Sequence, residues 1–387
     1  MRFSLPVSAL VASLVGFGST LALIISAANA LGASQAQTAS MVTTMCLAIA
    51  VTSGFLSIHF RMPVITAWST PGLAIIAGSS GIAFADAIGT FLLVAVLILF
   101  TSAFKPLGVL ISKIPKSIAS AMLAGVLLQF VMRVFTSLQT DGLFVGTLLL
   151  TYLIVWYFSV SGAVIAVLAV GLILIFGTPE LVHLEPLAPI IFGEGFATLS
   201  ITLPGFDLQV LLGLGIPLYL VTMASQNLPG FAVLQSNGYE PPTRPILFAT
   251  GLASLFTAMF GAVTTNMAAI TAAICMGKET HPDPDKRWIS GAFYAVFYCV
   301  LAIFSTSLVV IFDVLPGSLV ATVAGLALLG ALTGALGTAL ANKDDHFVAV
   351  VTFAVTASGL QLFGIGSAFW GLIAGLIIYH LLKHKKT

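Results

Sequence analysis

The chain has 387 residues, of which 59% are hydrophobic and 7% charged, and its formal net charge at pH 7 is +1. An ordinary soluble domain carries roughly 25% charged residues, so this composition excludes a protein whose surface lies mostly in water. The near-neutral charge offers no electrostatic basis for binding nucleic acid. We therefore expect a polytopic membrane protein whose main solvent is the lipid bilayer.

Apolar segments recur along the whole chain, separated by charged residues and by clusters of Gly, Pro and Asn. A helix needs roughly 20 residues to cross the hydrocarbon layer, and we predict about fourteen transmembrane spans. They lie at residues 6–29, 38–58, 63–77, 87–103, 117–136, 142–158, 161–176, 209–232, 242–260, 262–277, 288–312, 317–341, 347–362 and 366–382.

The basic residues predict the orientation of these spans. Of the 14 Lys and Arg residues, all except Arg133 fall on one side of the membrane under this count. Cytoplasmic loops retain Lys and Arg, so the N- and C-termini are both predicted to be cytoplasmic, in the cell inner membrane. The loop at 177–208, which contains Glu180, Glu185 and Glu194 but no Lys or Arg, is then external.

The spans divide into two related halves. Seven precede the 177–208 loop and seven follow it, so the second half starts from the opposite side of the membrane. The third span of each half is short, at 63–77 and 262–277. The predicted fold is an all-α polytopic membrane protein, a seven-plus-seven inverted repeat with broken third and tenth spans.

The two short spans carry matching polar residues. Thr66, Ser69 and Thr70 precede Pro71, which suits the first turn of a helix rather than its interior. The tenth span has the corresponding Thr264, Thr265 and Asn266 ahead of a run of helix-forming residues. We predict an extended stretch and then a half-helix in each, with both positive helix ends at the midplane, where they attract an anion. The alternative is ordinary packing between membrane helices.

The eighth span contains three adjacent polar residues, Ser225, Gln226 and Asn227, just before Pro229. Contact between helices is the plain explanation for one such residue. Three in a row point in different directions, which favours a substrate site in which Gln226 or Asn227 hydrogen-bonds the ligand. Phe17 in the first span is a further candidate, because its ring can stack on an aromatic ligand.

The sequence lacks the motifs that mark phosphate binding, metal binding and thiol chemistry. The chain has no Gly-rich phosphate loop, no His-Glu-x-x-His and no Cys-x-x-Cys, so we expect no cofactor, no metal site and no enzymatic activity. No span interior contains Asp, Glu, Lys or His, the usual proton relays, and the proton-coupling residue stays open.

Five segments together resemble the benzoate/proton symporter family known as BenE. They are Arg61-Met-Pro-Val-Ile-Thr-Ala-Trp-Ser-Thr-Pro-Gly, Val221-Thr-Met-Ala-Ser-Gln-Asn-Leu-Pro-Gly-Phe-Ala, Ala268-Ala-Ile-Thr-Ala-Ala-Ile-Cys, Thr356-Ala-Ser-Gly-Leu and residues 364–375. The resemblance implies the seven-plus-seven fold of uracil and purine permeases and of sulfate-type anion transporters. It also implies a core domain from residues 1–103 and 209–312 (spans 1–4 and 8–11) and a gate domain from 104–208 and 313–387 (spans 5–7 and 12–14).

The resemblance implies a secondary transporter that imports benzoate or a related aromatic carboxylate with a proton, by alternating access. Homodimerisation through the gate domain is an expectation from the fold. Nucleobase permeases resemble this plan but carry acidic residues where this chain has Gln226 and Asn266. Neutral amides suit an anionic ligand better, because two negative groups repel at low dielectric. A nucleobase or inorganic-anion transporter of the same fold is the alternative.

Overall fold

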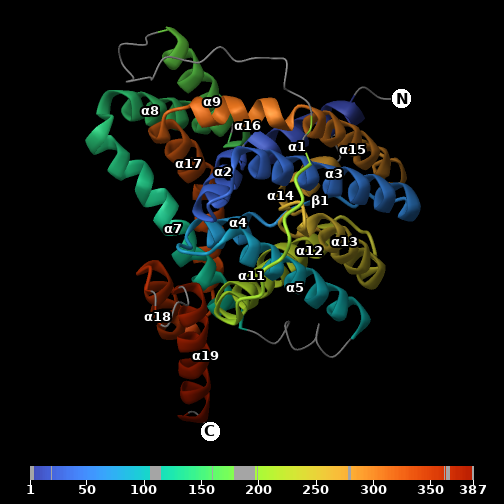
Figure 1. The fold of residues 1–387 in the computed structure, drawn as a ribbon. Coiled ribbons are helices and arrows are strands. Elements are labelled where there is room, and N and C mark those ends of the chain that lie inside the picture. The colour runs from blue at the N-terminus through green and yellow to red at the C-terminus, as the bar shows by residue number, and fades with distance from the viewer. Residues whose placement is uncertain are drawn as a thin grey trace.

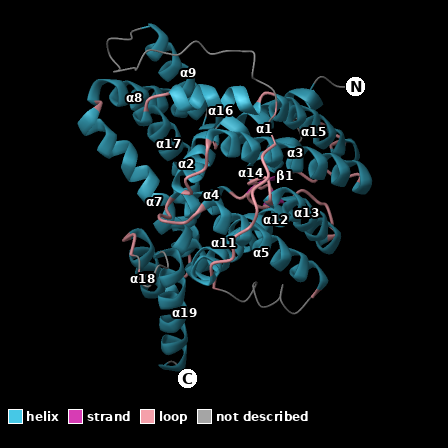
Figure 2. Ribbon diagram, in the orientation of Figure 1, coloured by secondary structure: helices cyan, strands magenta, loops and turns pink. Residues whose placement is uncertain are grey.

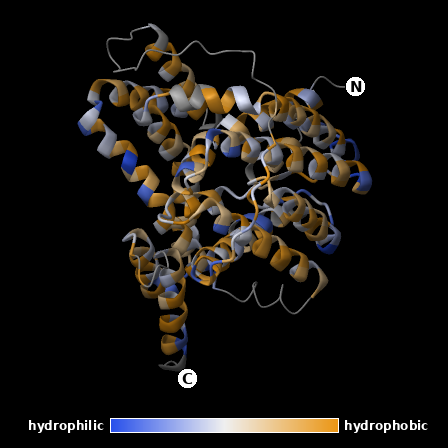
Figure 3. Ribbon diagram, viewed as in Figure 1, coloured by the Kyte–Doolittle hydropathy of each residue, from blue (hydrophilic) through white to orange (hydrophobic). Residues whose placement is uncertain are grey.

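The computed structural model describes the chain except residues 1–3, 19, 105–114, 159, 178–196, 198, 278–279, 361, 363–366 and 386–387. The predicted external glutamates and the basic residues Arg2, Lys105, Lys113, Lys278 and Lys386 lie outside the described residues. The described part is predominantly helical, and apolar residues dominate the helices (Figure 3).

The first half of the chain contains eight helices and one short strand in the described residues. They are α1 (Ser4–Gly18), α2 (Leu21–Ala30), α3 (Gln35–Phe60), β1 (Thr66–Trp68), α4 (Thr70–Ala77), α5 (Phe84–Ala103), α7 (Lys116–Thr140), α8 (Gly142–Phe158) and α9 (Val160–Gly177).

The second half is divided into more elements. It contains α10 (Leu208–Val210), η3 (Leu211–Gly215), α11 (Ile216–Thr222), η4 (Met223–Asn227), α12 (Leu228–Ser236), α13 (Thr243–Ala258), β2 (Thr265–Met267), α14 (Ile270–Met276), η5 (Pro284–Lys286), α15 (Trp288–Ile303), α16 (Ser305–Val314), α17 (Gly317–Ala339), η6 (Lys343–Asp345), α18 (His346–Ala357) and α19 (Ser367–Lys385).

Length and apolarity make many of these helices suitable for crossing a membrane. In the described part of the chain, six helical segments meet both conditions: Ser4–Ala30, Gln35–Phe60, Phe84–Ala103, Lys116–Thr140, Pro284–Ile303 and Gly317–Ala339. Four shorter apolar helical segments accompany them, at Gly142–Phe158, Gly162–Ile175, Leu208–Thr222 and Ser367–Lys383. The protein is therefore built around several membrane-spanning helices.

Three predicted spans are not the single α-helices that the hydropathy pattern indicates. The first breaks between α1 and α2, next to Thr20, whose hydroxyl donates to the Gly16 carbonyl at 2.6 Å. The eleventh breaks at Phe304 into α15 and α16. The eighth contains two π-helical segments, η3 and η4, each ending two residues before a proline, Pro217 or Pro229.

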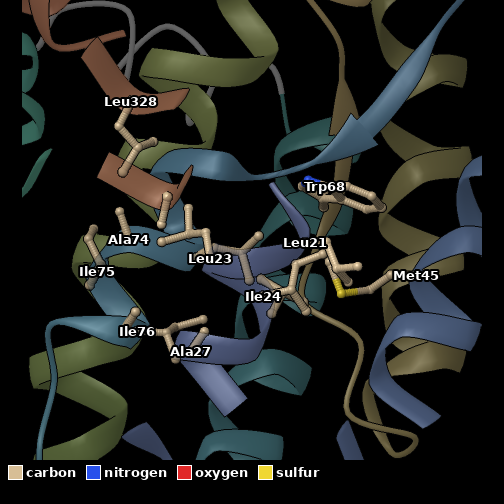
Figure 4. Packing of buried hydrophobic residues seen from close by; sticks show 14 of the residues in the cluster. Leu21, Leu23, Ile24, Ala27, Met45, Trp68, Ala74, Ile75, Ile76 and Leu328 are labelled. Carbon is tan, nitrogen blue, oxygen red and sulfur yellow. The ribbon is translucent and has the colours of Figure 1, made fainter. Parts of the chain in front are cut away.

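The interior is one hydrophobic cluster that extends across both halves of the chain. Figure 4 shows its centre, where Leu23 and Ile24 of α2 lie beside Ala74 and Ile76 of α4. Leu328 of α17 lies on one side of this group and Trp68 and Met45 on the other (Figure 4). Helix α2 lies between β1 and α17 (Figure 1).

The segment at residues 199–207 crosses the outside of several helices, as the yellow-green trace in Figure 1 shows. Its backbone amides bind groups from three elements: Ser200 to the Ser40 hydroxyl at 2.9 Å, Thr202 to the Met259 carbonyl at 2.9 Å, and Gly205 to the Ala85 carbonyl at 2.8 Å. A chain segment without its own secondary structure is held in place by these bonds.

We expect Gly89→Ala to lower the melting temperature of the purified protein substantially. A Cβ atom at Gly89 would lie 1.7 Å from the carbonyl oxygen of Gly205, and backbone cannot rotate away as a side chain can. Such overpacking costs about 1–3 kcal/mol. Gly146→Ala in α8 is the matched control, because its added Cβ meets nothing within 4 Å. Equal melting temperatures for the two variants would contradict the predicted clash.

Candidate functional site

The two short strands meet in the middle of the helical structure (Figure 2). They pair antiparallel, with Ala67 opposite Asn266 and Trp68 opposite Thr265, and the Ala268 amide extends the ladder to the Ile65 carbonyl at 2.9 Å. This confirms the sequence prediction of an extended stretch followed by a short helix in both segments. We call this pair of strands, with the first residues of α4 and α14, the crossing.

Helix α4 begins at the crossing for a reason that is visible in the sequence. Pro71 lies in its first turn, where a missing amide costs no hydrogen bond, and the Ser69 hydroxyl accepts from the Gly72 amide at 3.1 Å. Thr222 of α11 donates to the same Ser69 oxygen at 2.9 Å. Thr70, also predicted for the site, is the half-buried first residue of α4.

Asn227 and Asn266 form one buried hydrogen-bond network. The Asn227 Nδ2 donates to Asn266 Oδ1 at 3.2 Å, and Asn227 Oδ1 accepts from the Met267 amide at 2.9 Å. Asn266 Nδ2 in turn donates to the Thr264 carbonyl at 2.8 Å and to its hydroxyl at 3.0 Å. Both asparagines are fully buried, so their amides join η4 to β2.

Gln226 differs from its neighbour Asn227. Its side chain is half-buried, and its Nε2 donates to the Trp68 carbonyl at 3.3 Å, a long bond. The amide oxygen of Gln226 accepts no hydrogen bond from the described residues, so this side chain is free to rearrange next to the end of β1. The side chain of Ser225 lies outside what the structure describes.

Hydrogen bonds from one threonine in each strand tie the strands to the helices that flank them. The Thr66 hydroxyl lies 2.7 Å from the hydroxyls of Thr52 and Ser53 in α3, and the Thr66 amide donates to Ser53 Oγ at 3.0 Å. The Thr265 amide makes the equivalent bond to Ser254 Oγ of α13 at 2.9 Å. The same contact thus joins α3 to β1 and α13 to β2.

An aromatic wall borders the crossing. The ring of Trp68 lies edge-on to Phe17 of α1 at 6.0 Å and to Tyr298 of α15 at 5.9 Å between centroids. Its indole nitrogen donates to the Thr20 hydroxyl at 3.0 Å, which holds the ring in place. Phe17 was expected from the sequence, but Tyr298 was not; its spacing of four from Tyr294, on one helix face, is the signal that indicates it.

Close backbone approach shapes the other side of the crossing. A Cβ atom at Gly230 of α12 would lie 2.4 Å from Met267 Cβ and 2.9 Å from the Ala268 carbonyl oxygen. Only glycine allows α12 this close to β2. Gly230 therefore admits the strand, an effect that the sequence pattern alone does not reveal.

The crossing carries no formal charge. The segments 62–77, 219–232 and 262–277 contain no Asp, Glu, Lys, Arg or His. Hydroxyls, amides and aromatic rings are therefore the only groups these segments can offer a ligand. This arrangement can hydrogen-bond and orient an anion, while nothing in these segments can act as a strong acid or base at neutral pH.

Comparison with known proteins identifies the family. Residues 2–381 match the family described as Benzoate membrane transport protein. The chain is 40% identical over 386 residues to "Inner membrane protein YdcO" of Escherichia coli (strain K12), covering 98% of this chain and 97% of that protein. It is 35% identical over 385 residues to "Benzoate membrane transport protein" of Acinetobacter baylyi, covering 99% and 96%.

Solved structures share the fold. SLC26A9 matches with a TM-score of 0.64 at 13% identity, over 98% of this chain and 66% of that one. The transmembrane domain of the bicarbonate transporter BicA matches with a TM-score of 0.63 at 14% identity, over 97% and 98%. The chain thus shares the fold of these structures. The family match and the Acinetobacter relative make it a membrane transport protein and not an enzyme. On the match over nearly its whole length, the chain belongs to the Benzoate membrane transport protein family.

Proposed function

We propose that the protein is a secondary active transporter of the cell inner membrane that imports benzoate or a related aromatic carboxylate together with a proton. The observation that carries this proposal is the uncharged crossing, where an amide, hydroxyls and an aromatic wall meet at the start of α4. The name of the Escherichia coli relative supports the inner membrane, and that of the Acinetobacter relative supports the substrate.

The carboxylate is the part of the ligand that the helix end favours. The N-terminus of α4 carries the partial positive charge of its helix, which stabilises an anion in a water-poor setting. Gln226 lies next to it and can exchange its long bond to Trp68 for a bond to the ligand. The lack of any acidic side chain in these segments removes the repulsion that a carboxylate would otherwise meet.

The ring of the ligand is the part that the aromatic wall favours. Phe17 and Trp68 present ring edges and faces beside the crossing, and aromatic pairs contribute about 0.5–1.5 kcal/mol beyond the area that they bury. An inorganic anion gains nothing from such a wall. This is the feature that separates an aromatic carboxylate from the ligands of an inorganic-anion transporter with the same fold.

The proposed contacts divide the predicted site residues into two groups. Gln226 and Thr70 are half-buried beside the start of α4, and we assign them to ligand contact together with Phe17 of the aromatic wall. Ser69, Asn227, Asn266, Thr66, Thr264 and Thr265 were also predicted from the sequence to contact the ligand. They are buried and bonded to neighbouring backbone or side chains, so we assign them to positioning the crossing. Ser225 keeps its predicted ligand contact as part of the proposal.

The proposed transport cycle is movement of a core domain against a gate domain. The matched bonds of Thr66 to Ser53 and Thr265 to Ser254 support the inverted repeat, because they join the second and third spans of each half. We retain fourteen spans, cytoplasmic termini, the domain boundaries given above and a homodimer through the gate domain as parts of the proposal. Each follows from the charge pattern or the resemblance.

The first test is the melting temperature of the purified protein with benzoate, substituted benzoates, uracil, xanthine and sulfate, since a ligand that binds the native state stabilises it. We expect benzoate to raise the melting temperature and the other classes to leave it unchanged. Stabilisation by uracil, xanthine or sulfate alone would overturn the substrate. Uptake of labelled benzoate into proteoliposomes, with and without an inward proton gradient and against protein-free liposomes, then tests the coupling.

A further inference from the structure

A cavity of about 270 Å³ lies between α2, α7 and α17, away from the crossing. Its lining includes Ser26 and Asn29 of α2, Phe130 and Arg133 of α7, and Val320 and Ala321 of α17. None of its lining residues belongs to β1, β2, η4, α4 or α14. A cavity of about 150 Å³ is enough to bind benzene, so this one has room for an aromatic ring and a carboxylate.

Arg133 is the charged group of this cavity. Its guanidinium carbon lies 5.3 Å from the centroid of the Phe130 ring, and the side chain is exposed. In the described part of the chain, no carboxylate lies within ion-pair distance of Arg133; the ion pair found there joins Lys286 and Asp283. A guanidinium with free donors and an aromatic neighbour is a ready partner for a planar anion.

Two uncharged polar side chains share the same lining. The Ser26 hydroxyl and the Asn29 side-chain amide have no hydrogen-bond partner among the described residues. The rest of the lining is apolar and includes Ile25, Leu315 and Ala324. The cavity therefore combines one cation and two spare hydrogen-bonding groups with an apolar wall, which is the usual composition of a small-molecule site.

We propose that this cavity is a second binding site for an aromatic carboxylate, with Arg133 and Asn29 on the carboxylate and Phe130 and the α17 wall on the ring. The ligand class rests on the proposed function. Under the predicted domain division, α2 belongs to the core and α7 and α17 to the gate. A ligand here lies on the seam between them, on the outer side where Arg133 is the single predicted basic residue, and meets the protein before it reaches the crossing.

The test uses a cysteine in the cavity wall. Ala321→Cys is introduced with Cys299→Ser, because Cys46 and Cys275 are buried and Cys299 is exposed. The rate of maleimide labelling at position 321 is measured against benzoate concentration. We expect benzoate to slow labelling. The benzoate concentration that halves the labelling rate, the half-protecting concentration, should rise about 10-fold or more in Arg133→Gln and by less in Arg133→Lys. Gln226→Ala should leave this protection unchanged.

Two controls separate the site from general effects. Arg244→Gln removes an exposed arginine whose guanidinium binds the Ala103 carbonyl, and it should not alter the protection. A cysteine replacing the exposed Thr243 of α13 should label at the same rate with and without benzoate.

The outcomes distinguish this inference from the function on which it rests. Equal half-protecting concentrations in Arg133→Gln and its parent would overturn the second site. Loss of the protection in Gln226→Ala would also overturn the second site, because the protection would then report a conformational change caused by binding at the crossing. Protection absent while benzoate still raises the melting temperature overturns the second site alone. Absence of both effects overturns the proposed function as well.

Discussion

Asn227→Ala is expected to destabilise the protein more than any other single amide removal at the crossing. The variant leaves the Met267 amide and the Asn266 side-chain oxygen without their partner in a fully buried place. Each buried group left unpaired costs about 1–3 kcal/mol, so for two groups we expect a loss of roughly 2–6 kcal/mol in the free energy of unfolding. The measurement is the melting temperature of the purified protein.

Asn237→Ala is the matched control for this prediction. Asn237 is half-buried at the end of α12, and its amide donates to one carbonyl of its own helix, Val233, at 2.9 Å. Its loss should lower the melting temperature only slightly. A melting temperature for Asn227→Ala as high as that of Asn237→Ala would show that the amide network does not hold η4 to β2.

Gln226→Ala is expected to remove most of the affinity for benzoate while the protein stays folded. Gln226 is half-buried and makes one long bond to the Trp68 carbonyl, so its removal leaves little buried polar surface without a hydrogen-bond partner. A hydrogen bond to a charged group contributes about 1.5–3 kcal/mol, which corresponds to roughly a 10- to 100-fold weaker dissociation constant. The measurement is the benzoate concentration that gives half of the maximal thermal stabilisation.

Gln226→Glu extends the same experiment. A carboxylate at this position faces the ligand's own carboxylate in a setting of low dielectric, and we expect a larger loss of affinity than for alanine. Gln35→Ala, which truncates an exposed glutamine at the start of α3, is the control and should bind as the parent does. An unchanged dissociation constant in both Gln226 variants would remove Gln226 from the ligand site.

Local sequence signals located the crossing well. Pro71 cannot lie inside a helix, and the polar residues before it marked where α4 begins; the structure confirms this with a cap on Ser69. The matched tenth segment was found by its position in the second half and likewise forms a strand and a short helix. The first signal depends on a few neighbouring residues and the second on the order of spans along the chain, and both can be read from a single sequence.

The breaks in the first, eighth and eleventh spans were missed for a related reason. Hydropathy measures whether a segment prefers lipid, and an interruption of one turn in a long apolar run hardly changes it. The Thr20 hydroxyl next to the first break donates to the Gly16 carbonyl within the same span. The π-helical turns before Pro217 and Pro229 likewise lie inside one apolar span, so neither feature changes the apolar pattern.

Composition and charge pattern, read without coordinates, establish a membrane chain, because too few charged residues are present to cover a surface in water. The polar residues of the two short spans, with Pro71 in the first of them, indicate the breaks before α4 and α14. Whether a side-chain amide is available to a ligand or already hydrogen-bonded within the protein depends on groups far apart in the chain. Asn227 meets Asn266 and Met267 only because β1 and β2 pair. The tertiary structure alone separates Gln226 from Asn227, since burial and hydrogen-bond satisfaction are properties of the folded neighbourhood and not of the residue type.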